Sequence, residues 1–193
     1  MPKEKVIHYP NGAIKEKKYL LEGKIHGQYT TYFPSGQIMA QLHFSSGKKN
    51  GSAISYYANG QVREKVNFAN DKMDGPCVSY YENGHLREEE HFQQGKFDGE
   101  DICYYKSGQI KEKGLFKRDK REGEYISYFK NGQIREKATY KNGNLTGKFL
   151  SFREDGTHAD EDSGEDEDSK RIWEDKDIGN LLHDLSHFDK KQK

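Results

Sequence analysis

Three groups of residues in this sequence have types and spacings that could do chemistry: regularly spaced glutamates, two cysteines and a histidine pair. The glutamates are Glu16, Glu64, Glu88, Glu112 and Glu136, and paired carboxylates can act as general acid and base. A row of identical groups is better explained by structure, because a catalytic site is an asymmetric constellation within a pocket. We interpret the glutamates as structural acceptors for tyrosine hydroxyls.

The cysteines and histidines also lack the partners that chemistry would require. Cys77 and Cys103 lie on strands expected to be about 9.5 Å apart, whereas a disulfide tolerates a Cα separation of at most about 7 Å. We therefore expect free thiols. His183 and His187 stand four residues apart on a predicted helix, but two metal ligands without a third are insufficient. We predict no catalytic residue, no cofactor and no metal, and a protein that is not an enzyme.

A repeated unit of 24 residues positions most of these groups. Two glycine series keep this spacing, one from Gly12 to Gly156 and one from Gly27 to Gly147. An unrelated globular sequence would not hold two series in frame for so long, so the chain is a repeat array. After a lead-in at 1–8, the units are 9–32, 33–56, 57–80, 81–104, 105–128, 129–152 and a partial unit at 153–156.

Each unit reads as two short strands and two turns. In residues 61–68, apolar or glutamate side chains alternate with polar ones, which is typical of a strand, and Gly, Asn and Asp cluster in the turns. The predicted fold is all-β, an elongated single-layer antiparallel meander of β-hairpin repeats. Its low apolar content fits a thin molecule, since hydrophobic residues make up 32% and charged residues 33% of the chain.

Equivalent side chains should form ladders across the sheet. We expect three ladders, which begin at Ile14, Leu20 and Tyr32, to share one face and hold the sheet together. The opposite face should then carry an aromatic ladder beside a row of serines. The aromatic ladder consists of Tyr9, Phe33, Tyr57, Tyr81, Tyr105 and Phe129.

The end of the chain differs in composition from the repeats. Residues 1–153 contain 26 Lys+Arg and 18 Asp+Glu, whereas residues 154–193 contain 6 and 14. Residues 157–171 should be an acidic, disordered linker, and the apolar spacing in 172–189 predicts a short amphipathic helix before a basic end at 190–193. Such a helix is marginal alone in water, so it needs a surface to bind. The first residues lack an apolar run and no stretch reaches membrane-spanning length, so we expect a cytoplasmic protein.

The repeat resembles a known family. The run Tyr-Tyr-x-Asn-Gly-x-(Ile/Leu)-(Arg/Lys)-Glu, followed by an aromatic residue and x-x-Gly-Lys-x-(Asp/His)-Gly, is similar to the MORN-repeat variant of bacterial YwqK-type antitoxins, over residues 9–156. The resemblance implies an elongated β-hairpin array and neutralisation of a partner toxin. Asp71 and Asp119 replace the turn glycine and Thr30 interrupts an Ile/Val ladder, so we expect local turn changes without loss of the fold.

These features favour an antitoxin or immunity protein that inactivates a protein toxin by stoichiometric binding. If the toxin acts on nucleic acid, residues 160–168 could occupy its basic groove while apolar residues anchor nearby. The residues expected to bind the partner are Tyr57, Tyr81, Tyr105, Phe129, Asp162, Glu165, Asp166, Glu167, Asp168, Trp173, Leu181, Leu182, Leu185 and Phe188.

Two alternatives remain open. The predicted helix could instead cap the last repeat near Tyr140 and Phe152. The chain could also be a non-catalytic scaffold or bind anionic membranes through its basic array, which is less favoured because acidic residues are mixed with the basic ones. We expect no direct binding of nucleic acid, because the acidic end of the chain would compete for the same surface.

Overall fold

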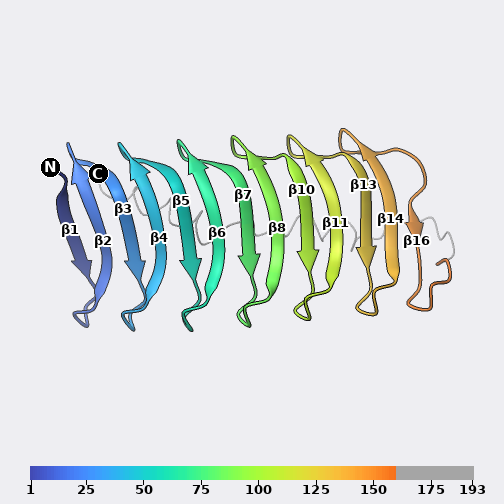
Figure 1. Cartoon of the computed structure of the whole chain (residues 1–193), viewed down its shortest axis with the longest axis horizontal. Coiled ribbons are helices and arrows are strands. Elements are labelled where there is room, and N and C mark those ends of the chain that lie inside the picture. Colours follow the sequence, from blue (N-terminus) through green and yellow to red (C-terminus); the bar gives the residue numbers. More distant parts are fainter. Residues whose placement is uncertain (160–193) are drawn as a thin grey trace.

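The repeats build one open antiparallel sheet. In the computed structural model, which describes residues 1–159, 16 strands form a single sheet in which strands adjacent in sequence pair along its length (Figure 1). The predicted all-β, single-layer meander is confirmed, whereas the predicted helix lies outside the described residues. Within those residues there is no helix capable of spanning a bilayer. The strands are β1 (Lys3–His8), β2 (Ile14–Leu21), β3 (Lys24–Tyr32), β4 (Ile38–Ser45), β5 (Lys48–Tyr56), β6 (Val62–Ala69), β7 (Lys72–Tyr80), β8 (Leu86–Gln93), β9 (Lys96–Phe97), β10 (Gly99–Tyr104), β11 (Ile110–Lys117), β12 (Lys120–Arg121), β13 (Gly123–Tyr128), β14 (Ile134–Lys141), β15 (Asn144–Leu145) and β16 (Leu150–Ser151).

Two-residue turns join the strands within each hairpin such as β6–β7. Asn70 and Asp71 both have positive φ, at 50° and 70°, as in the type I′ turn that matches the twist of the strands. Asp119 has φ of 68° at the equivalent position. The two aspartates therefore adopt the same turn as the glycines of other units, and the prediction of local turn changes there was wrong. Each carboxylate compensates for the missing glycine by accepting a backbone hydrogen bond from the preceding unit, at 2.8 Å from Lys49 N and 2.9 Å from Phe97 N.

Longer turns join the hairpins and are tied to one another. Between β5 and β6, Gly60 N donates to Tyr57 O at 2.9 Å. The Tyr57 hydroxyl donates at 2.7 Å to the carbonyl oxygen of Tyr80, the last residue of β7, and Asn59 Nδ2 donates to Glu82 O in the next turn at 3.1 Å. The tyrosine contact recurs at Tyr9, Tyr81 and Tyr105. These bonds hold each turn that contains such a tyrosine in place against the following unit.

The strand register shows which side chains share a face. In β6 and β7, Glu64 lies opposite Ser79, Val66 opposite Cys77, and Phe68 opposite Met73. We name the face that carries these positions in every unit the carboxylate face. Tyr80 belongs to the opposite face, so the prediction that its ladder shares a face with Phe68 was wrong.

The apolar core also differs from the expected one. The ladder of isoleucines was predicted to hold the sheet together, but Ile14, Ile38, Ile110 and Ile134 are 36–38% exposed. A β-bulge lies directly beside this ladder, for example between Ser55 and Tyr56. It interrupts the alternation of side chains between the two faces, so the ladder does not continue the core. The core lies on the carboxylate face, where the cluster comprises Ile25, Tyr29, Ala40, Leu42, Ala53, Val66, Phe68, Cys77 and Phe92.

Candidate functional site

A row of carboxylates and small hydrogen-bond donors crosses the carboxylate face. Strand pairing places its members side by side, and most of the glutamates are buried. In order along the sheet, the row is Glu64, Ser79, Glu88, Cys103, Glu112, Ser127, Glu136 and Ser151. This arrangement agrees with the structural role that the sequence predicts for the glutamates.

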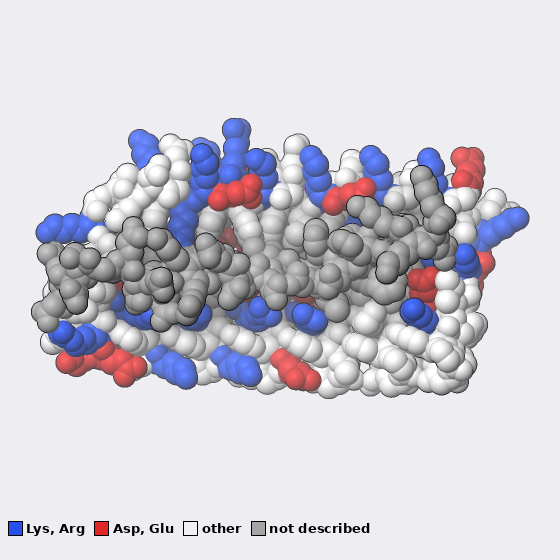
Figure 2. Space-filling view, turned by 180° about the vertical axis from the view of Figure 1, so that it is seen from behind, with Lys and Arg blue, Asp and Glu red and all other residues white. Residues whose placement is uncertain are grey.

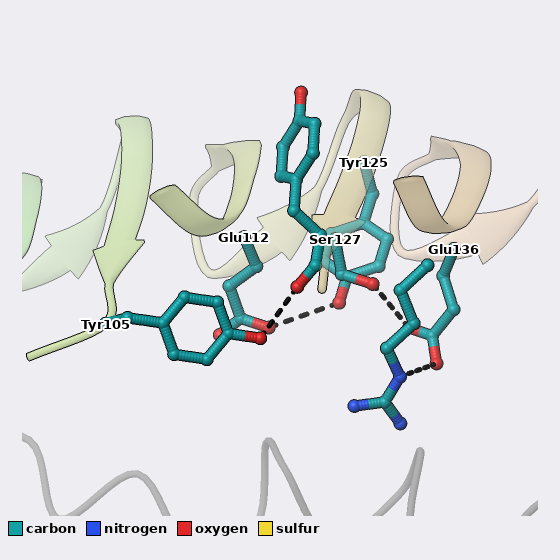
Figure 3. A network of polar contacts seen from close by, with 7 residues as sticks. Tyr105, Glu112, Tyr125, Ser127 and Glu136 are labelled. Atoms are coloured by element: carbon teal, nitrogen blue, oxygen red, sulfur yellow. Dashed lines mark hydrogen bonds and ion pairs between the residues drawn. The ribbon is translucent and has the colours of Figure 1, made fainter. Parts of the chain in front are cut away.

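Hydrogen bonds connect this row (Figure 3). Tyr125 donates its hydroxyl to Glu112 Oε2 at 3.2 Å, and Ser127 donates to Glu136 Oε2 at 3.0 Å. The ring of Tyr105 reaches toward the same network from the adjacent turn (Figure 3), and its hydroxyl donates to a backbone carbonyl. In the other units the donors are Tyr29 to Glu16 at 2.5 Å, Cys77 to Glu64 at 3.6 Å and Cys103 to Glu88 at 3.3 Å.

The surroundings of two of these carboxyls shift their pKa values in opposite directions. Burial raises the pKa of Glu64, although the Cys77 thiol partly counteracts it. Burial also acts on Glu16, but there the hydrogen bonds from Tyr29 and Lys18 outweigh it and lower the pKa. Equivalent positions in the repeat therefore carry carboxyls with opposite pKa shifts.

The cysteines are free thiols, as predicted, and the environment of Cys77 makes its thiol unreactive. Burial and the nearby Glu64 carboxylate raise its thiol pKa far above the ordinary value. Since the thiolate is the nucleophile, this thiol is poorly suited to attack a substrate.

The fourth unit concentrates acidic groups and a thiol. One donor atom each from Glu88, Asp101 and Cys103 lie within 4.8 Å of one another, and Glu90 is buried on the same strand as Glu88. The unit 57–80 has Val66, Cys77 and Ser79 where this unit has Glu90, Asp101 and Cys103. Oxygen and sulfur donors at this spacing could contact a divalent cation from three sides.

Cations stack on aromatic rings near the two-residue turns of the same face. Lys49 Nζ lies 4.9 Å from the centre of the Phe68 ring, and the Arg121 guanidinium lies 4.8 Å from that of Tyr125. Burial lowers the pKa of Lys49. These cations and rings form amphipathic positions beside the row of carboxylates.

The face offers an extended surface with shallow relief. The depression between Gly114, Arg121, Tyr125 and Tyr140 is too shallow to enclose a water molecule, whereas small-molecule sites typically measure about 300–1,000 Å³. This geometry suits contact with another polypeptide segment better than enclosure of a small substrate.

The sequence-predicted binding residues fall into two sets. Tyr57, Tyr81, Tyr105 and Phe129 lie half-buried at the longer turns, along one margin of the carboxylate face. The remaining ten, from Asp162 to Phe188, lie outside the described residues. Sequence reasoning missed the hydroxyls of Tyr29 and Tyr125, because only the strand register places these residues on the same face as the glutamates.

Comparison with known proteins identifies the repeat. The MORN repeat variant matches residues 25–46, 49–70, 73–94, 97–118 and 121–142, more than half of the chain. Each matched repeat begins near the start of one predicted unit's second strand and ends in the two-residue turn of the next unit. The comparison with curated proteins finds no match for this chain. The chain belongs to the MORN repeat variant family.

Proposed function

We propose that this chain is a non-catalytic binding protein of the antitoxin type, which neutralises a protein toxin by forming a stoichiometric complex. The carboxylate face carries the argument, since its described part presents repeated rows of rings, carboxylates and cations along an open sheet. Membership of a repeat family supports a binding role, because stacked repeats create extended surfaces for partners.

The aromatic margin and the acidic segment supply the contacts in this proposal. The hydroxyls of Tyr57, Tyr81 and Tyr105 bind backbone carbonyls, which fixes the rings and lowers the entropy lost when a partner packs on them. The acidic residues are Asp162, Glu165, Asp166, Glu167 and Asp168. Their charge accelerates association with a basic groove, such as that of a toxin acting on nucleic acid.

The test begins with capture of partners from cells of the source organism and ends with a growth assay. A captured protein should arrest growth when expressed alone, and co-expression of this chain should restore growth through a 1:1 complex. Replacing the five acidic residues by their amides should slow association, and raising the salt concentration should reduce the difference from wild type. A harmless partner, or a toxin neutralised by catalytic amounts of this chain, contradicts the proposal.

A membrane-associated scaffold is the second candidate, favoured by the positive charge of the array. Residues 1–159 contain 26 Lys+Arg and 20 Asp+Glu, and Figure 2 shows basic side chains spread along one face of the molecule. Flotation with phosphatidylserine vesicles distinguishes the two candidates. Salt-sensitive flotation of the full chain without a protein partner supports the scaffold, and absence of flotation favours the antitoxin.

A further inference from the structure

An apolar row on the carboxylate face runs through the described units without a described element above it. It consists of paired positions next to the two-residue turns, and we name it the aromatic row. Most side chains of this row are buried or half-buried, with Phe68 9% and Phe92 3% exposed. A sheet packs such a row against another element, yet within residues 1–159 no strand crosses this face (Figure 1). The pairs of the aromatic row are Leu20 with Ile25, Phe44 with Lys49, Phe68 with Met73, Phe92 with Phe97, Phe116 with Arg121 and Tyr140 with Leu145.

We propose that residues 172–189 of the same chain dock along the aromatic row and form a second layer of the fold. The segment supplies apolar side chains at helical spacing that match the row in character. They are Trp173, Ile178, Leu181, Leu182, Leu185 and Phe188. Among the roles that the sequence leaves open for this segment, the structure favours contact with the face of the sheet over a cap at its end.

The length of the chain permits this contact. The described part ends at Ala159, whose backbone N donates to Ser151 O beside the last strand at 3.0 Å. Residues 160–171 can span up to about 40 Å, and 18 helical residues would add about 27 Å. A sheet with about twelve strand spacings is roughly 58 Å long, so the segment reaches the middle strands.

Charge favours docking on the aromatic row over docking on the row of carboxylates. Residues 160–193 contain 6 Lys+Arg and 12 Asp+Glu. Lys49 and Arg121 belong to the aromatic row and each lies over a ring, whereas the glutamates lie further from these turns. An acidic amphipathic segment placed over the aromatic row meets both apolar side chains and cations.

This inference does not rest on the proposed function, because it concerns the isolated chain. Trp173 is the single tryptophan of the protein, so its fluorescence reports on residues 172–189 alone. We expect a blue-shifted emission and a several-fold slower quenching by acrylamide than for the same chain in denaturant. Neither property should depend on protein concentration.

Three variants of the full chain locate the contact. The double change Leu182→Asp and Leu185→Asp leaves the sheet sequence intact and should shift Trp173 emission to that of a solvent-exposed indole. Met73→Asp in the aromatic row should do the same. Val78→Asp, a half-buried position of the same strand on the opposite face, is the matched control and should leave the emission blue-shifted. Far-ultraviolet circular dichroism verifies that each sheet is folded.

Other outcomes overturn the inference. An exposed Trp173 in the wild-type chain excludes docking. Equal effects of the two β7 variants place the segment elsewhere, and protection that disappears on dilution assigns the contact to a second copy of the chain. If Met73→Asp fails to fold, the tail double variant still decides whether Trp173 is held by Leu182 and Leu185.

Discussion

At the scale of single residues, the row of carboxylates makes stability depend on pH in different directions at equivalent positions. Burial raises the pKa of Glu64, so the folded state prefers the protonated form. The stability contributed by that form is present at low pH and is lost as the pH rises through the folded-state pKa. We expect Glu64→Gln to raise the thermal midpoint at pH 7 by a few degrees and to have little effect at pH 4.

Glu16 provides the matched control for this prediction. Its pKa is lowered because hydrogen bonds from Tyr29 and Lys18 outweigh the effect of burial, so its stabilisation is present at neutral pH and is lost as the pH falls. Glu16→Gln should therefore lower the midpoint at pH 7, with a smaller effect in acid. Shifts of the same sign for both variants would refute the assignment.

The second glycine series has its own prediction. Gly99 has φ of 142° and Gly75 has φ of 98°, and both lie in bulged strands. A Cβ at Gly99 would lie 2.7 Å from His91 Cβ, whereas one at Gly75 would meet only Asn67 Nδ2 at 3.9 Å. Both alanine variants should destabilise, and Gly99→Ala by about 1–3 kcal/mol more because the backbone must also shift. Urea unfolding of the two variants measures this difference, and equal losses would exclude the steric contribution.

The sequence predicted the glutamates as hydrogen-bond acceptors for tyrosine hydroxyls, but it did not predict which residue donates in each unit. A glutamate that recurs at one strand position needs a hydrogen-bond donor when it is buried. Its role as an acceptor was therefore predictable. The donors come from two repeat positions: one holds Tyr29, Cys77 and Tyr125, and the other holds Cys103 and Ser127. Only the register of the strands shows that both positions face the glutamates.

At the scale of elements, the aspartate turns test how one side chain replaces a glycine. Asp71 holds φ of 70° while its Oδ1 accepts a hydrogen bond from Lys49 N. Asp71→Ala keeps the left-handed backbone but loses the acceptor, and should cost about 1–2 kcal/mol. Asp71→Asn retains a carbonyl oxygen and tolerates positive φ, so it should remain near wild type in chemical denaturation. Equal stability of Ala and Asn variants would show that the hydrogen bond is unimportant.

The strands and turns were more predictable than their faces. Period-two alternation and clustered Gly, Asn and Asp identified the hairpins correctly, because both signals are local. The faces depend on the register across each turn. A two-residue turn pairs Phe68 with Met73, and the Gly75 bulge then keeps Cys77 and Ser79 on that face, which moves Tyr80 to the other one.

At the scale of the whole molecule, the array has no centre. In the described part, each strand pairs only with strands one or two places away in sequence, so the stability of the array is approximately a sum over units and the interfaces between them. The fold therefore depends on the 24-residue period. We expect the chain to tolerate an insertion or deletion only if it preserves this period.

Deleting one period tests this directly. Removal of residues 42–65 joins Gln41 to Val66, so the hybrid strand keeps the side-chain alternation of β4 and β6. This chain should fold into a shorter sheet whose urea m-value is lower by roughly one sixth. Removal of residues 42–64 differs by one residue and joins Gln41 to Lys65, which places a lysine where Leu42 stands in the core and turns the rest of that strand over. We expect this second chain to lose cooperative unfolding, and a cooperative transition in both chains would show that the period does not control the fold.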